Sequence, residues 1–262
     1  MTFPLRKLLL VPVVLAVVLP AAAADWLDFL KPKPAPTSSP AASAPASLAG
    51  LSQDQMVSGL KEALDKGVQH AIAALGKPDG FLKDLRVKIP MPEKLQTIER
   101  TLRTLGQDKL ADDFVTTMNR AAEQALPEAA GVLADSLRQL SVADAKAILT
   151  GTNNAATQFF RRTSETNLYA RFLPIIRTAT ETAGVNSAYK KMTDKAAGGI
   201  GGLGGFASGL LGKEAPDLDS YVTRKALDGL FVKIGDEEQR IRENPVARTT
   251  ELLKTVFGAV GK

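Results

Sequence analysis

Apolar side chains recur every three or four residues along most of the chain from Ser52 onward. Leu110, Phe114, Met118 and Ala122, for example, follow one another at four-residue spacing. Such spacing places side chains on one face of an α-helix, whereas a half-buried strand alternates apolar and polar residues. We find no convincing two-residue alternation in the sequence. The pattern therefore predicts an all-α fold, a bundle of about eight or nine helices joined by short turns, with no β-sheet.

Capping residues and prolines indicate where these helices begin and end. Ser52 is a candidate N-cap, and Ser141 with Asp144 forms a variant of the capping box. Pro127 and Pro174 lie inside helical patterns, so each is expected to kink or restart a helix. The expected helices cover residues 52–75, 92–105, 108–140, 141–151, 154–184, 189–197, 217–243 and 245–257.

The helix that ends near residue 243 carries opposite charges four residues apart. Side chains at this spacing are neighbours on a helix surface and can form ion pairs. The sequence predicts three such pairs on the outer face: Arg224 with Asp228, Asp236 with Arg240, and Glu238 with Arg242.

The first 24 residues have the three parts of a signal peptide. Arg6 and Lys7 precede the apolar run Leu8–Leu19, and four alanines end at Ala24. The apolar run is shorter than the roughly 20 residues that a helix needs to cross a bilayer. We expect cleavage after Ala24 and export to the periplasm of a Gram-negative-type bacterium.

Two further segments have compositions unlike a packed core. Residues 25–47 are rich in Pro, Ala and Ser and predict a flexible tether, which begins with Trp26 and Phe29. Those aromatics are either a docking motif for a partner or membrane surface, or simply the frayed end left by processing. Residues 48–262 predict a single helical domain, interrupted by a Gly-rich loop at 198–212. That loop is either a flexible connection, or a segment that orders on a membrane surface or covers an apolar pocket.

Composition excludes several chemistries. The chain has no cysteine and a single histidine, His70, which excludes disulfides, thiol catalysis and cysteine-ligated metals. We therefore predict no metal and no cofactor. The formal charge is +5, and loss of Arg6 and Lys7 lowers it by two. This mild excess is spread along the chain, so we expect no nucleic-acid partner.

Some charged residues occupy positions where they could point between helices, which is where helical bundles place their sites. Solvated helix faces and structural ion pairs would also explain them. The speculative ligand-binding residues are Arg120, Glu123, Arg161, Lys225, Asp228 and Arg248.

Several longer strings resemble the bacterial family called domain of unknown function 4197, over roughly residues 51–258. The resemblance implies an exported helical protein and carries over no activity, cofactor or partner. The strings are residues 50–64, 89–92, 112–123, 151–160, 221–231 and 244–250.

Three functions are consistent with these observations. We favour a non-catalytic protein that binds an apolar ligand between its helices, or an envelope protein. One alternative is a hydrolase-type enzyme that uses Asp, Glu, Arg and Lys without a metal or thiol. The other is a structural or assembly factor that acts through the N-terminal tether, with a peripheral membrane contact also considered.

Overall fold

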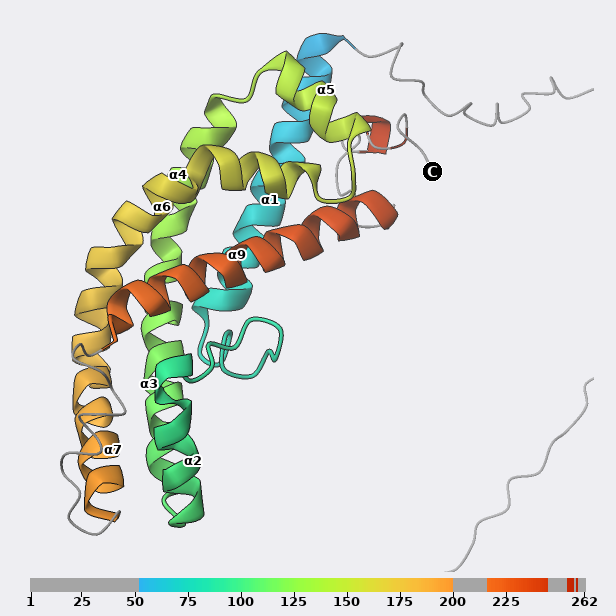
Figure 1. Cartoon of the computed structure of the whole chain (residues 1–262). Helices are drawn as coiled ribbons and strands as arrows, with labels where there is room; N and C mark the ends of the chain where they lie inside the picture. The colour runs from blue at the N-terminus through green and yellow to red at the C-terminus, as the bar shows by residue number, and fades with distance from the viewer. Residues whose placement is uncertain (1–51, 200–215, 245–253, 257, 259–262) are drawn as a thin grey trace, which may run out of the picture. The chain divides into compact units, whose positions relative to one another are not determined.

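The computed structural model describes residues 52–199, 216–244, 254–256 and 258, all of which belong to one compact unit, Pro45–Lys262 (Figure 1). These residues contain eight α-helices and no strand, which confirms the predicted all-α class. No helix among them combines the length and apolar character needed to cross a membrane. The helices are α1 (Gln53–Gly76), α2 (Gln96–Thr104), α3 (Asp108–Ala125), α4 (Ala129–Arg138), α5 (Val142–Thr150), α6 (Ala155–Thr182), α7 (Val185–Gly199) and α9 (Leu218–Glu243), with two 3-10 turns, η3 (Glu93–Leu95) and η4 (Leu126–Glu128).

Some sequence predictions concern residues outside this description. They are the signal peptide 1–24, the tether 25–47, most of the Gly-rich segment 198–212, Arg248, and most of the predicted last helix. Of that last helix, residues 254–256 and 258 are helical.

Local capping explains where several helices begin. Ser52 and Ser141 are the N-caps of α1 and α5, as predicted. Ser141 forms the predicted capping box with Asp144, and Ser52 also forms one, with Gln55. Pro127 lies in η4, the 3-10 turn that follows α3 and separates it from α4. In contrast, α6 continues as a helix through Pro174.

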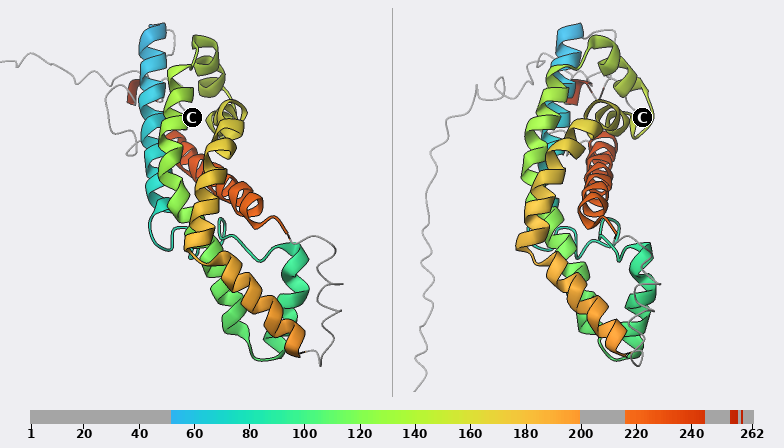
Figure 2. Two further views of the ribbon diagram at one scale, coloured as in Figure 1. Left: turned by 90° about the vertical axis from the view of Figure 1, so that its left-hand side faces the viewer. Right: turned by 60° about the vertical axis from the view of Figure 1, so that its left-hand side comes forward.

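Helix α9 lies across several others and forms the centre of the packing. It contacts α6, α1 and α3, and Figures 1 and 2 show it crossing α1 and α3 obliquely. Its buried residues include Leu227, Leu230, Phe231 and Ile234. Because α9 is packed on more than one side, few of its positions are free to face solvent.

A second group of helices packs around the start of α3. Helices α2 and α7 both contact α3 and also contact each other (Figures 1 and 2). The Phe114 ring of α3 lies 6.3 Å, centroid to centroid, from the Tyr189 ring of α7. Leu102 of α2 and Met192 of α7 are fully buried in this region.

Residues 77–92 connect α1 to η3 without a helix, yet they are firmly anchored. Phe81 and Ile89 are fully buried. The Asn119 side chain, also fully buried on α3, pairs with both backbone groups of Ile89. Its Oδ1 accepts from the Ile89 N–H at 2.9 Å, and its Nδ2 donates to the Ile89 carbonyl at 2.9 Å and to the Val115 carbonyl at 2.7 Å. Asn119 therefore fixes an irregular segment that no secondary structure supports.

Phe81 also sets a steric limit on α9. A Cβ added at Gly229 would lie 2.6 Å from Cε1 of the Phe81 ring, which is too close for any carbon pair. Gly229 thus permits the segment 77–92 to pack directly on the α9 backbone.

We predict that Gly229→Ala lowers the free energy of unfolding by about 1–3 kcal/mol, because the buried ring must move. Gly235→Ala is the matched control on the same helix. Its new Cβ would meet only Thr157 Oγ1, at 3.6 Å. Alanine is the better helix former, so this variant should gain about 0.5–1 kcal/mol. Urea unfolding followed by circular dichroism measures both, and equal effects at the two sites would contradict the packing described.

Candidate functional site

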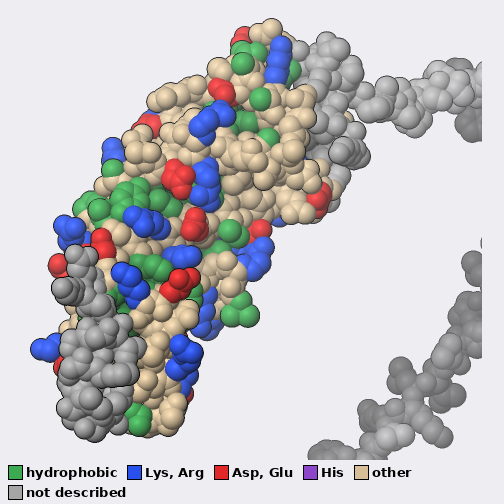
Figure 3. Space-filling model, in the orientation of Figure 1, with side chains coloured by type: hydrophobic (Ala, Val, Ile, Leu, Met, Phe, Trp, Pro, Cys, Tyr) green, Lys and Arg blue, Asp and Glu red, His purple; other side chains and the backbone are tan. Residues whose placement is uncertain are grey.

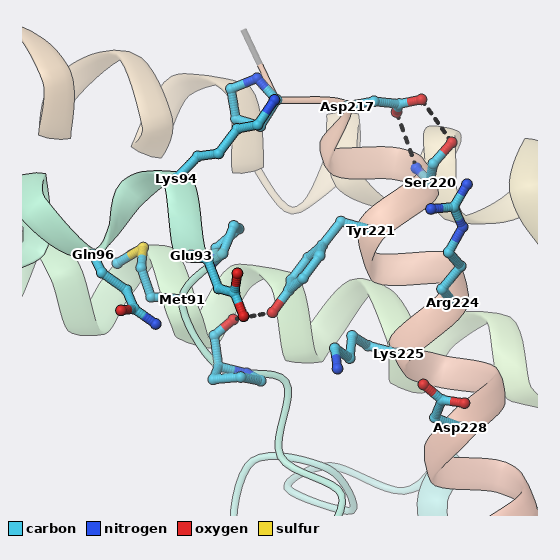
Figure 4. A pocket seen from close by; sticks show the side chains of 13 residues that line it. Met91, Glu93, Lys94, Gln96, Asp217, Ser220, Tyr221, Arg224, Lys225 and Asp228 are labelled. Carbon is cyan, nitrogen blue, oxygen red and sulfur yellow. Dashed lines mark hydrogen bonds between the residues drawn. The ribbon is translucent and has the colours of Figure 1, made fainter. Parts of the chain in front are cut away.

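A groove of about 610 Å³ lies beside the first half of α9 (Figure 4). One wall is the segment Pro90–Gln96, which includes η3, and the other is Pro216–Asp228. We refer to it as the α9 groove. The anchored segment 77–92 positions the first wall, so the groove depends on packing deeper in the protein.

Apolar groups form much of the groove. Met91 and Pro92 are buried beneath it, and Tyr221 projects into it from α9 (Figure 4). The Tyr221 hydroxyl donates to the Pro90 carbonyl at 3.0 Å, which joins the two walls. Burial raises the pKa of Tyr221, and the negative charge of Glu93 raises it further. The hydroxyl therefore stays protonated and the ring presents hydrocarbon to the groove.

Hydrogen bonds fix the first turn of α9. Asp217, the N-cap, accepts from the Ser220 N–H at 3.0 Å and from the Ser220 hydroxyl at 2.6 Å. These bonds from Ser220 hold the pKa of Asp217 below its usual range. The Tyr169 hydroxyl of α6 donates to Ser220 Oγ at 3.0 Å. Ser220 is thus engaged in holding the helix terminus, and we assign it no chemical role.

A second cavity, of about 480 Å³, adjoins the groove on the side of α6. It is lined by Glu165, Thr166, Tyr169 and Leu227, and it shares Arg224 and Asp228 with the α9 groove. The two cavities meet at these shared side chains.

The charges around the groove are unevenly paired. Among the described residues, Lys94, Arg224 and Lys225 form no salt bridge. Asp228 lies 3.5 Å from Arg161, and Asp217 is used as the helix cap. On the space-filling surface, basic, acidic and hydrophobic side chains are interspersed (Figure 3).

Two of the predicted site residues belong to a different cluster. Arg120 donates to Glu123 at 2.7 Å and to Asp79 at 2.5 Å. Glu123, which is 4% exposed, also accepts from the Phe81 N–H at 3.2 Å. Neither Arg120 nor Glu123 lines the α9 groove. Their contacts hold the segment 77–92 against α3. Neither of these two side chains is therefore directed at a cavity as an acid or a base.

The remaining predicted residues lie near the groove or outside the description. Lys225 and Asp228 line it. Arg161 sits beside it, with its guanidinium carbon 4.5 Å from the centroid of the Phe231 ring. Arg248 lies outside the described residues. The five described residues therefore fall into two groups and do not converge on one pocket.

Sequence reasoning missed several residues that line the groove, above all Met91 and Tyr221. It also predicted Arg224 only as a member of an ion pair and not as a lining residue. A signal existed in the extended segment Ile89-Pro90-Met91-Pro92, which precedes a helix and cannot pair as a strand. Its apolar side chains required a partner surface. The sequence did not indicate that α9 provides this partner surface. Tyr221 of α9, which contacts Pro90, lies some 130 residues later in the chain.

The arrangement favours binding over bond-breaking chemistry. The groove offers buried hydrocarbon with a few charged groups around it, as small-molecule sites do. Within the described parts of the chain, no three His, Cys, Asp or Glu residues come together as a metal site requires.

Comparison with known proteins gives one match. No curated protein and no solved structure matches the chain. The model of one family, described as "Protein of unknown function (DUF4197)", matches residues 50–258. This range covers all the described helices, including both walls of the α9 groove. The chain therefore belongs to the DUF4197 family.

Proposed function

We propose that this protein is a non-catalytic binding protein that holds an apolar ligand in the α9 groove. The observation that carries the proposal is the groove itself, about 610 Å³ with Met91, Pro92 and Tyr221 as apolar surfaces. Cavities of this size bury most of a small ligand. We propose further that the protein acts in the periplasm after removal of residues 1–24.

The contacts around the groove support a preformed site. Tyr221 bridges the two walls, Asp217 fixes the start of α9, and Asn119 fixes the segment that leads to Met91. A site held in this way loses little conformational entropy when a ligand enters. It therefore does not need a large closing movement to bind.

The test is binding of a neutral apolar fluorophore, N-phenyl-1-naphthylamine, to the mature protein. We expect fluorescence enhancement with wild type. Lys225→Trp should reduce binding by about tenfold or more, because an indole at this half-buried position occupies the groove and removes contact area worth about 1.4 kcal/mol.

Lys146→Trp is the matched control. Lys146 is exposed on α5, away from the groove, and the change has the same chemistry. It should leave binding unchanged, and circular dichroism should show both variants folded. No enhancement with wild type, or equal loss in both variants, would refute the proposed site. Native mass spectrometry of protein purified without detergent then identifies what the groove carries.

A further inference from the structure

We propose that the occupant of the α9 groove is a single-chain amphiphile with an anionic head group, held by Arg224 and Lys225. This inference rests on the proposed function and adds the chemical class of the ligand. It follows from the charges that remain available once the internal contacts of the groove have been assigned.

The cations of the groove are available. Arg224 is exposed and Lys225 half-buried on adjacent positions of α9, and Lys94 lies on the opposite wall (Figure 4). Within the described structure none of the three forms a salt bridge. Nearby arginines such as Arg161 and Arg177 do, with Asp228 and Asp219.

Most acids of the groove are already engaged. Asp217 accepts two hydrogen bonds from Ser220, and Asp228 faces Arg161 at 3.5 Å. Glu93, beside Tyr221, is the acid without such a contact, whereas Asp217 keeps its charge and its pKa is lowered further by Arg177 and Arg224. The lining cations without a salt bridge, Lys94, Arg224 and Lys225, are therefore the groups placed to receive a negatively charged head group.

Hydrocarbon surface extends away from these cations in two directions. Met91 and Tyr221 lie on one side, and Tyr169 and Leu227 lie in the adjoining cavity that shares Arg224. Both tyrosine hydroxyls are bonded inside the protein, to Ser220 and Pro90, so their rings offer apolar faces. An alkyl chain can lie on either surface while its head group stays near Arg224. Each methylene buried contributes about 0.8 kcal/mol.

A carboxylate and a phosphate monoester share this chemistry, so the experiment compares both. Dodecanoate, dodecyl phosphate, dodecanol and dodecyltrimethylammonium are each tested in competition with N-phenyl-1-naphthylamine, the ionic compounds below their micelle concentrations and dodecanol below its solubility limit. We expect the two anions to displace the fluorophore at about tenfold lower concentration than dodecanol. The stronger of the two anions identifies the head group. High salt should reduce this advantage, because it screens exposed charges.

The double variant Arg224→Gln/Lys225→Gln should bring the anions to the level of dodecanol, with displacement by each competitor referred to the fluorophore affinity measured for that variant. Arg171→Gln/Lys146→Gln, two exposed cations elsewhere, is the matched control and should keep the preference. Equal displacement by anion, alcohol and cation, or a preference that survives loss of Arg224 and Lys225, would overturn the inference while the groove still binds. Failure of the fluorophore to bind wild type would instead refute the proposed function.

Discussion

Replacing Glu238 with alanine should lower the free energy of unfolding by about 3–5 kcal/mol, the largest effect we expect from one side chain. Glu238 is buried on α9 but serves α6, whose N-cap residue Asn154 provides no side-chain cap. Its two oxygens accept from the Ala156 and Thr157 N–H groups, each at 2.9 Å. Arg242 donates to the same carboxylate at 2.9 Å.

The size of the effect comes from what Glu238→Ala leaves behind. Two N–H groups at the start of α6 lose their acceptor, and the negative charge that favours a helix N-terminus disappears. The Arg242 side chain, 11% exposed, loses its buried carboxylate partner and keeps its bond to the Ile148 carbonyl. Glu238→Gln keeps an acceptor without the charge and should lose less, about 1–2 kcal/mol.

Glu237→Ala is the matched control, one residue away. Glu237 pairs with Arg240 and approaches His70 near the surface, where ion pairs contribute about 0–1 kcal/mol. Chemical denaturation of the three variants gives the comparison. A loss at Glu238 no greater than at Glu237 would show that the cap of α6 is not made by α9.

The second large effect should come from Asn119→Leu, at about 2–4 kcal/mol. The side chains are similar in size, so the change removes hydrogen bonds rather than volume. The Ile89 N–H and carbonyl would remain buried without their partner, and each unsatisfied group costs about 1–3 kcal/mol. Met91 and Pro92, which line the α9 groove, come two and three residues after Ile89. Binding of the fluorophore in the groove should therefore weaken as well.

Gln124→Leu, an exposed position on the same helix, is the control. It should stay within about 0.5 kcal/mol of wild type and bind the fluorophore normally. If Asn119→Leu unfolded at the wild-type denaturant concentration, the buried amide would not be what anchors residues 77–92.

The sequence predicted helices well because their signals are local. Ser52 and Ser141 sit next to the backbone groups that they cap, and apolar spacing within one helix defines its buried face. The same local argument failed where packing decides. Glu238 was expected on an outer face, paired with Arg242. The pair exists, but Glu238 is 5% exposed because α6 covers that side of α9.

Two other predicted pairs of α9 changed partners for a related reason. Asp236 pairs with Arg86 and Asp228 faces Arg161, whereas Arg240 pairs with Glu237 within α9 itself. Helical spacing shows which charges can meet within α9, but it contains no information about charges brought by α6 or by residues 77–92. The candidate site was predicted only in part, at Lys225 and Asp228, because its other wall is distant in sequence.

The cap that Glu238 provides for α6 also has a consequence for the order of synthesis. The ribosome synthesises Ala156 and Thr157 about eighty residues before Glu238, because that is the sequence separation between the donors and the acceptor of these hydrogen bonds. During that interval the first turn of α6 has no acceptor from α9, and α1 and α3 lack the helix that packs on both. The native core is therefore completed only after α9 has been made, so a chain stopped before α9 should stay protease-sensitive rather than form a smaller stable domain.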